Sequence, residues 1–181
     1  PLASRAALRH ADGMTRLHLV IGPVGSGKST FALKLAREHR AVRLILDEWI
    51  VTLFRADRPD TGFVPWYAER VQRCIEQIWK LARSIIAIDT DVVLEIGLIQ
   101  QRERERFYAR ADAAGYPLTV YLLDAPRELR QERVERRNRE QGDTFSMVVP
   151  AEIFELASDM WEPPDDAELS QRSIRVISAC W

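Results

Sequence analysis

Residues 17–30 read Leu17-His-Leu-Val-Ile-Gly-Pro-Val-Gly-Ser-Gly-Lys-Ser-Thr30. The first five of them are typical of a buried strand, and a helix pattern follows the glycines. The loop in between, Gly22-x-x-x-x-Gly27-Lys28-Ser29, fits every fixed position of the Walker A pattern. This segment therefore predicts a strand, a phosphate-binding loop and a helix, in a chain that binds a nucleoside triphosphate.

The residue types of this loop suit the phosphates of a nucleotide. Glycines allow the tight backbone angles of such a loop, and its amides, with those of the helix N-terminus, then point at the anion. We expect Lys28 to reach the β- and γ-phosphates, Ser29 to put its hydroxyl on Mg²⁺, and Thr30 to contact the α-phosphate. The predicted nucleotide contacts in this segment are Gly22, Val24, Gly25, Ser26, Gly27, Lys28, Ser29 and Thr30.

Composition limits the classes of partner. The chain has 181 residues with 26 basic and 27 acidic side chains, so its net charge is −1. Nothing in this balance draws the chain to nucleic acid or to a membrane surface, and no apolar run approaches the roughly 18 residues of a membrane span. The two cysteines, Cys74 and Cys180, have no metal or redox spacing. We expect free thiols and a cytoplasmic protein, either a monomer or a homodimer.

The domain organisation is expected to be simple. Residues 1–13 have no strand character and are interpreted as an N-terminal extension or a cloning remnant, with Met14 as a possible natural start. Residues 14–181 are of a length that suits one domain with a sizeable core. We therefore predict a single domain over 14–181.

Strand and helix patterns alternate along this domain. Strands are expected at 17–21, 42–46, 92–96, 118–123 and 174–177, and helices at 29–38, 49–58, 66–87, 101–114, 127–140 and 150–161. The alternation predicts an α/β fold with a parallel sheet, in which ligands bind beyond the carboxyl ends of the strands. The loops at that edge begin at Gly22, Asp47, Glu95 and Asp124.

Acidic residues at this edge are the candidates for catalysis. Asp47 directly follows the second strand and could accept a proton from a substrate hydroxyl, or it could cap the next helix. Glu48 is the alternative base. Glu95 ends the third strand and could orient Mg²⁺ or grip the acceptor, or simply cap the turn at Gly97. Asp91 opens that strand at the opposite edge and is given no role.

The segment from Arg127 to Glu140 predicts a helix rich in arginine. Arg130, Arg133 and Arg137 share one face, where a bound anion would relieve their repulsion. We interpret residues 127–145 as a lid that closes over phosphates, against the alternative of a solvated helix with i,i+4 ion pairs.

Other residues receive weaker assignments. The aromatic group of Trp49, Phe54, Phe63, Trp66 and Tyr67 could line an acceptor pocket or belong to the core, with Phe63 and Trp66 the best candidates for the pocket. Arg55 could hold an anionic group of the acceptor or face solvent. The three histidines, His10, His18 and His39, show no ligand or triad arrangement and are interpreted as structural.

Four pieces of the chain resemble the small P-loop kinases, in the group that includes polynucleotide 5′-kinase, chloramphenicol phosphotransferase and zeta-toxin-type kinases. These pieces are residues 22–30, the strand that ends at Asp47, the segment 120–138 and the segment 161–168. The resemblance implies a three-layer fold with strand order 2-3-1-4-5 and a helical lid. It implies Asp47 as the base, Arg133 against the adenine and Arg137 on the phosphates. An arginine often follows this aspartate closely in such kinases, whereas here the first is Arg55.

The sequence therefore predicts an ATP-dependent kinase that phosphorylates a hydroxyl of a small molecule, with Mg²⁺. The predicted catalytic residues are Lys28, Asp47, Arg133 and Arg137, with Ser29 and Glu95 at the metal and Arg133 also on the nucleotide. Alternatives are a P-loop ATPase or nucleotide switch that acts through a partner, and a polynucleotide 5′-hydroxyl kinase. Nucleic acid is the less favoured acceptor because the chain has no excess of positive charge.

Overall fold

Within residues 14–143 and 145–178, which the computed structural model describes, five parallel strands form one sheet in the order β2-β3-β1-β4-β5. The strands are β1 (Leu17–Ile21), β2 (Val42–Ile45), β3 (Val92–Glu95), β4 (Leu118–Asp124) and β5 (Ile174–Ser178). In register, Leu17 of β1 lies between Val92 of β3 and Leu118 of β4. The predicted α/β class and the strand order are both confirmed.

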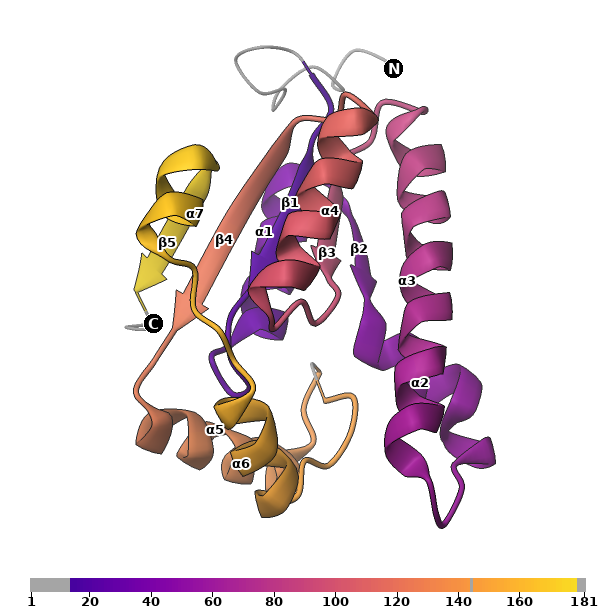
Figure 1. Cartoon of the computed structure of the whole chain (residues 1–181), viewed down its shortest axis with the longest axis vertical. Coiled ribbons are helices and arrows are strands. Elements are labelled where there is room, and N and C mark those ends of the chain that lie inside the picture. The colour runs from indigo at the N-terminus through magenta and orange to yellow at the C-terminus, as the bar shows by residue number, and fades with distance from the viewer. Residues whose placement is uncertain (1–13, 144, 179–181) are drawn as a thin grey trace, which may run out of the picture.

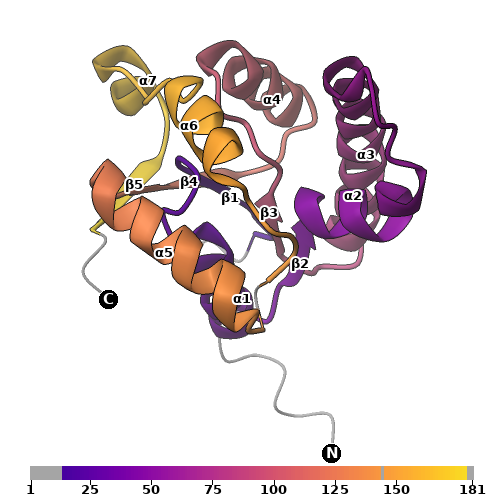
Figure 2. The same cartoon turned by 90° about the horizontal axis from the view of Figure 1, so that it is seen from below.

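Helices cover both faces of this sheet (Figures 1 and 2). Their bounds are α1 (Lys28–His39), α2 (Leu46–Phe54), α3 (Phe63–Ile86), α4 (Gln101–Ala113), α5 (Arg127–Glu140), α6 (Ala151–Asp159) and α7 (Asp166–Gln171), with a 3₁₀ turn η1 (Arg55–Asp57). The view along the sheet in Figure 2 places α1 on one side of it and α3, α4 and α7 on the other. The fold is therefore a three-layer α/β/α sandwich.

The core divides into two parts because successive side chains of a strand point to opposite faces. Leu17, Leu19 and Ile21 of β1 pack with buried residues of α3 and α4, including Trp79 and Phe107. The alternate face of the sheet packs on α1 through Val20, Val93, Tyr121, Leu123, Ala32 and Leu35. Two covered faces explain why the strands read as near-continuous apolar runs.

Two helices begin three residues earlier than predicted. Helix α2 begins at Leu46, so the second strand is one residue shorter than expected. Helix α3 begins at Phe63 and takes Pro65 into its first turn, where a missing backbone N–H costs nothing. Asp124, where a loop was predicted to begin, is the last residue of β4, and helix α5 has the predicted bounds.

Helix α7 was not predicted, because the segment was interpreted as a polar connection. Asp165 caps it by accepting a hydrogen bond from the backbone N–H of Glu168 at 2.7 Å. An aspartate followed three residues later by a glutamate is a helix-start signal, which the neighbouring prolines obscured.

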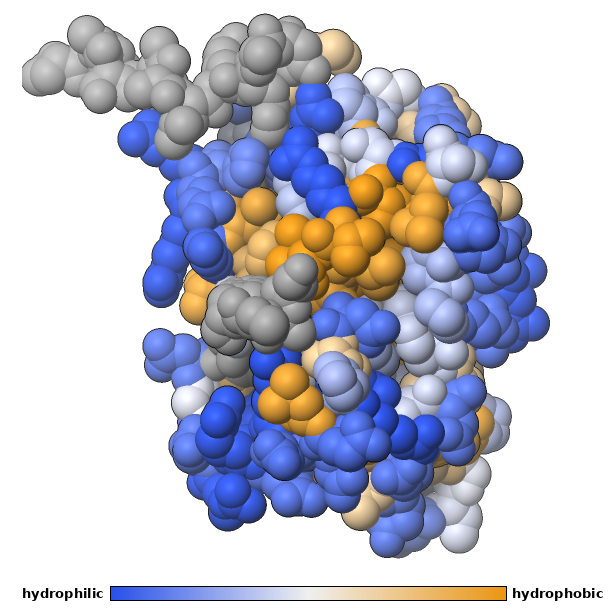
Figure 3. Space-filling view, turned by 90° about the vertical axis from the view of Figure 1, so that its left-hand side faces the viewer, coloured by the Kyte–Doolittle hydropathy of each residue, from blue (hydrophilic) through white to orange (hydrophobic). Residues whose placement is uncertain are grey.

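One edge of the sheet is open. Figure 3 views the molecule from the β5 side and shows apolar side chains gathered in a band across it. Val176, on the edge strand β5, is 65% exposed.

None of the helices formed by residues 14–143 and 145–178 combines the length and apolar character needed to cross a membrane.

Several predictions fall outside the described residues. The assignments of residues 1–13, with His10, and of Cys180 belong to this group, as does residue 144 within the predicted lid. Cys74 is described: it is a buried free thiol on α3, and burial raises its pKa.

Candidate active site

The loop between β1 and α1 has the close packing that its glycines predict. Gly22 has a φ of 146°, and a Cβ added there would lie 2.1 Å from the carbonyl oxygen of Leu123. Gly25 has a φ of 79°, and its added Cβ would lie 2.5 Å from the carbonyl oxygen of Arg130. Any side chain at these two positions would push the loop away from β4 and α5, so glycine is required by space as well as by backbone angle.

Lys28 and Ser29 open helix α1 directly after this loop. The Lys28 ammonium donates to the carbonyl oxygen of Pro23 at 2.8 Å, which folds the side chain back over its own loop. The Ser29 hydroxyl donates to Glu95 Oε1 at 3.0 Å. Ser26 is buried with its hydroxyl unpaired among the described residues, and Thr30 is exposed.

Glu95 and Ser29 suit a magnesium ion. Glu95 is only 7% exposed, and its Oε2 atom has no hydrogen-bond partner among the described residues. Because the Ser29 hydroxyl donates its proton to Oε1, its own oxygen stays available as a ligand. Mg²⁺ prefers hard oxygen ligands and keeps several water ligands. The unpaired Oε2 atom of Glu95 could accept a hydrogen bond from one of these waters.

Four charged side chains converge at the carboxyl edge of the sheet. Lys28 of α1, Asp47 of α2, Glu95 of β3 and Arg137 of α5 interact electrostatically with one another. Figure 1 shows why: α2, α5 and α6 all lie at the end of the sheet toward which the strands point. Two cations beside two carboxylates form the electrostatic arrangement expected for a charged substrate and its metal.

The surroundings shift the pKa of each member of this cluster. Burial among protein atoms raises the pKa of Asp47, against the opposing effects of Lys28 and Arg137. Burial also raises the pKa of Glu95, although Lys28 opposes the shift. Burial lowers the pKa of Lys28 and of Arg137, while Asp47 and Glu95 act in the opposite direction on both. The Asp47 side chain itself opens onto solvent, so a substrate can reach it.

Asp47 lies in the first turn of α2, and the N-cap of that helix is Ile45. The alternative prediction that Asp47 caps the helix is therefore wrong. Glu48, the alternative base, is exposed and accepts a hydrogen bond from Arg43 at 2.8 Å. Of the two acids, Asp47 is the one that lies with Lys28 and Arg137.

The spacing of Arg130 had placed it in a row of arginines that would face a phosphate. The structure gives it a different role. It is 7% exposed, and its guanidinium donates to the carbonyl oxygens of Val24 at 3.0 Å and Ala125 at 3.1 Å and to the Ser158 hydroxyl at 3.1 Å. These bonds fasten the phosphate-binding loop to α5 and α6. This role could not be predicted, because no local pattern marks a partner 28 or 106 residues away.

The segment after α5 is held in place from α5 itself. The Asn138 amide donates to the carbonyl oxygen of Val149 at 2.8 Å and accepts from its N–H at 3.1 Å.

Arg137 is half-buried, and its Nε atom has no hydrogen-bond partner among the described residues. Arg133 lies one turn earlier and is also half-buried, and its contact with the adenine stays a prediction.

The aromatic group divides between core and surface. Trp49, Phe54 and Tyr67 pack against the main core, whereas Phe63 and Trp66 lie in the first turn of α3. Phe63 had been predicted to lie before this helix. The Phe63 ring centroid is 5.9 Å from that of Trp66 and 5.5 Å from that of Tyr67. Burial raises the pKa of Tyr67, and Asp47 adds to the shift, so this aromatic surface lies near Asp47.

Arginines stack on the same surface, a feature that the sequence reasoning missed. The guanidinium of Arg58 lies 4.3 Å from the Phe63 ring centroid, and that of Arg70 lies 4.3 Å from the Trp66 centroid. Arg55, which was predicted either to hold an anionic group of the acceptor or to face solvent, is exposed in η1. No spacing rule would have selected Arg58 and Arg70 in advance.

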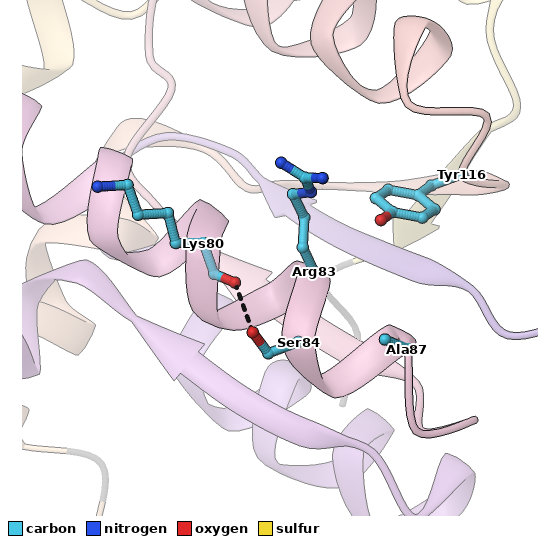
Figure 4. A pocket seen from close by; sticks show the side chains of 5 residues that line it. All are labelled: Lys80, Arg83, Ser84, Ala87 and Tyr116. Carbon is cyan, nitrogen blue, oxygen red and sulfur yellow. Dashed lines mark hydrogen bonds between the residues drawn. The ribbon is translucent and has the colours of Figure 1, made fainter.

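A surface hollow described by the structure lies apart from this site. It measures about 350 Å³ and is lined by Lys80, Arg83, Ser84, Ala87 and Tyr116. Figure 4 shows the α3 residues on one side of it and Tyr116 on the other, with a hydrogen bond between the Ser84 hydroxyl and the Lys80 carbonyl. The hollow is wide open and contains no residue of the converging charged cluster, so we assign it no role in the chemistry.

Solved structures with a similar fold include kinases. They include an unliganded sugar kinase from Janibacter sp. HTCC2649, with 17% identity, a TM-score of 0.59 and coverage of 91% of this chain and 86% of that chain. The APS kinase CysC of Mycobacterium tuberculosis, bound to AMPPNP and APS, has 16% identity and a TM-score of 0.60, with coverage of 91% of this chain and 88% of that chain. Kti12 of Chaetomium thermophilum, bound to ADP-AlF3, has 17% identity and a TM-score of 0.65, with coverage of 90% of this chain and 88% of that chain. At these identities the likeness concerns the fold.

No sequence among the curated proteins matches the chain. A profile of the AAA domain family matches residues 17–164, from the first strand to the segment before α7. The resemblance to the small P-loop kinases is thereby confirmed, and together the family and the fold support nucleotide-dependent phosphoryl transfer. Because the match spans most of the sequence, the chain belongs to the AAA domain family.

Proposed function

We propose that this protein transfers the γ-phosphate of ATP to a hydroxyl group of a small molecule. One observation carries the proposal: Asp47, open to solvent, lies with Lys28 and Arg137 at the carboxyl edge of the sheet and near the aromatic surface of α3. A phosphate donor on one side of Asp47 and an acceptor on the other is the arrangement that transfer to an alcohol requires.

In this reaction the acceptor oxygen attacks the γ-phosphorus, and the bond from that phosphorus to the β,γ-bridging oxygen breaks. ADP leaves with the electron pair, and the hydroxyl proton passes to the Asp47 carboxylate. Lys28 and Arg137 stabilise the charge on the transferring group. Bound Mg²⁺ neutralises the charge of the β- and γ-phosphates. Ser29 and Glu95 would hold it, Ser29 directly and Glu95 through water.

The nature of the acceptor is inferred from its surroundings. Phe63, Trp66 and Tyr67 offer apolar faces beside Asp47, and the stacked Arg58 and Arg70 add positive charge. A small molecule that combines a ring with polar or anionic groups would fit these side chains better than an uncharged alkyl alcohol. A sugar kinase and an APS kinase are among the structures of similar fold, which is consistent with such an acceptor. The cytoplasmic location and the monomer or homodimer stay predictions.

Transfer to water is the second candidate, because Kti12 shares the fold and was solved with ADP-AlF3. A partner-dependent ATPase would hydrolyse ATP without any added acceptor. A kinase gives acceptor-dependent turnover and a phosphorylated product. Transfer to a polynucleotide 5′-hydroxyl remains a further alternative, and an oligonucleotide in the pool of acceptors tests it.

The decisive variant is Asp47→Asn, with Glu48→Gln as its matched control on the adjacent residue. We expect Asp47→Asn to keep ATP affinity nearly intact and to lower transfer by about 10²–10⁴-fold, because the amide cannot take the proton. Glu48→Gln should transfer phosphate at nearly the wild-type rate. ATP affinity is measured by calorimetry and product formation by mass spectrometry. Unchanged transfer in Asp47→Asn would exclude Asp47 as the base.

A further inference from the structure

A second cluster of side chains with metal-binding chemistry lies at the opposite edge of the sheet from the phosphate-binding loop. His18 is the second residue of β1, His39 ends α1, and Asp91 directly precedes β3. His18 Nε2 is 3.2 Å from Asp91 Oδ2, and His39 Nδ1 is 3.9 Å from the same oxygen. One ligand atom from each of the three residues lies within 4.8 Å of the other two.

Neighbouring groups fix the orientation of two members of this cluster. The Tyr121 hydroxyl is 3.1 Å from His18 Nδ1 and holds the ring with Nε2 toward Asp91. The backbone N–H of Arg16 donates to Asp91 Oδ1 at 2.9 Å, which leaves Oδ2 facing the histidines. Metal-bound imidazoles and carboxylates are commonly oriented in this way by a second hydrogen bond.

We propose that His18, His39 and Asp91 form a binding site for a divalent transition-metal ion, and that Zn²⁺ fits this donor set best. Two imidazole nitrogens and one carboxylate oxygen, with water in the fourth position, form a tetrahedral Zn²⁺ site. With metal–ligand bonds of about 2.0–2.1 Å, neighbouring ligand atoms of a tetrahedron lie about 3.3 Å apart. The observed 3.2 Å and 3.9 Å separations from Asp91 bracket this value, and the two imidazole nitrogens, within 4.8 Å of each other, would be brought to it by rotation of the His39 ring.

The cluster is open enough for an ion to enter and buried enough to hold it. His18 is fully buried, whereas the side chains of Asp91 and His39 are 13% and 26% exposed. An ion would therefore enter past His39 and Asp91. Once bound, it would join the beginnings of β1 and β3 to the end of α1.

This site is separate from the predicted magnesium site. Helix α1 runs from Lys28 at the phosphate-binding loop to His39 at the cluster, and a helical rise of 1.5 Å per residue puts their backbones about 17 Å apart. The donor sets differ too, because imidazole nitrogen suits Zn²⁺ whereas oxygen ligands suit Mg²⁺. No residue of the converging charged cluster belongs to this site, so the ion would act independently of phosphoryl transfer.

The test uses the full chain without a histidine tag, after chelator treatment and removal of the chelator. Zn²⁺ is titrated by calorimetry, and Tm is measured with and without it. We expect one ion per chain and, at a hundredfold excess over Kd, a rise in Tm of about 5–10 °C. His39→Gln should lower the Zn²⁺ affinity at least tenfold without changing the metal-free Tm by more than about 2 °C, because His39 is partly exposed. Glu38→Gln, an exposed neighbour, is the matched control and should respond as the wild type.

Two results would overturn the proposal. Zn²⁺ that produces neither heat nor a shift in Tm would leave the cluster as a hydrogen-bonded His–Asp group. A response that persists in His39→Gln but disappears in Glu95→Gln would assign the ion to the phosphate-binding end. Because His39→Gln keeps the buried His18 and its bond to Asp91, loss of folding does not confuse the outcome.

Discussion

Glu95 and Glu168 are both buried carboxylates, 7% and 6% exposed, yet their surroundings are opposite. Glu168 accepts from Arg104 Nε and Nη2 at 2.7 Å each and from the Tyr108 hydroxyl at 2.7 Å. Glu95 accepts from Ser29 alone among the described residues, and its second oxygen has no partner there. Saturated hydrogen bonding indicates a structural role, whereas an orphaned buried carboxylate beside a phosphate-binding loop indicates a place for a ligand.

The Arg104–Glu168 pair also shows how a buried charge is made tolerable. Burial opposes the charged form of Arg104, but its hydrogen bonds with Glu168 and the charges of nearby groups together outweigh that effect and raise its pKa. Its remaining nitrogen donates to the Glu162 carbonyl at 2.8 Å. The pair joins α4 to α7 and positions the chain that enters β5. Glu95 has no arginine in direct contact among the described residues, and its pKa is raised by burial.

The largest stability effect should come from breaking the saturated pair. Glu168→Gln removes one charge and leaves the Arg104 cation, which is fully buried, without its counterion. We expect a loss of about 3–5 kcal/mol in the free energy of unfolding, measured by urea titration. Phosphoryl transfer per folded molecule should be unchanged. A loss below about 1 kcal/mol would mean that the pair contributes little to the fold.

The variant Glu95→Gln should have the opposite pattern. It keeps the acceptor for Ser29 and removes a charge that burial disfavours, so we expect a gain of about 0.5–2 kcal/mol in stability. Transfer should fall about 10–100-fold, because the metal loses a partner. Urea unfolding and steady-state kinetics measure the two effects. A variant that was both less stable and fully active would contradict the assignment of Glu95 to the metal.

The pH dependence of stability provides an independent check on Glu95. Because its pKa in the folded state lies above the ordinary 4.5, the folded protein binds this proton more tightly than the unfolded chain does. The contribution of Glu95 should therefore make the protein less stable as pH rises from about 4.5 through the raised pKa. Glu95→Gln should remove that decline from the pH profile, and an identical profile in both proteins would argue against the shift.

The smallest effect is expected at a pair with the same geometry on the surface. Arg110 donates to both oxygens of Glu76 at 2.7 Å, but the Glu76 side chain is 54% exposed. Glu76→Gln should cost at most about 1 kcal/mol, because water and salt screen the pair. Hydrogen bonding by Arg110 lowers the pKa of Glu76, so this contribution should be present above pH 4.5 and be lost as pH falls through the lowered pKa. A cost equal to that of Glu168→Gln would show that burial does not decide the strength of these pairs.

Much of the fold could be predicted from the sequence because its signals are local. Apolar runs, the glycine loop and the helix patterns marked all five strands and most helices within a few residues. The parallel sheet followed from the alternation of elements, whereas the strand order needed the resemblance to known kinases. Pro65 misled the prediction of α3, since a proline is compatible with both a loop and the first turn of a helix.

Site residues could be predicted from the sequence where a reactive side chain lies at the carboxyl end of a strand. Glu95 is the last residue of β3, Asp47 lies two residues after β2 ends, and the structure brings both to Lys28 and Arg137. Pairings between distant segments carry no local signal, so Arg130 was misplaced and the bond between Arg104 and Glu168, 64 residues apart, was missed. The approach of His18, His39 and Asp91 was missed for the same reason.

The most direct test of the central claim is ATP consumption by the purified protein with Mg²⁺, alone and with pooled hydroxyl acceptors. Lys28→Ala is the blank, because it removes the ammonium that lies over the phosphate-binding loop. The account predicts acceptor-dependent turnover in the wild type, a product heavier by one phosphoryl group, and neither in Lys28→Ala. Turnover that ignores every acceptor, or a wild type that binds no ATP, would contradict it.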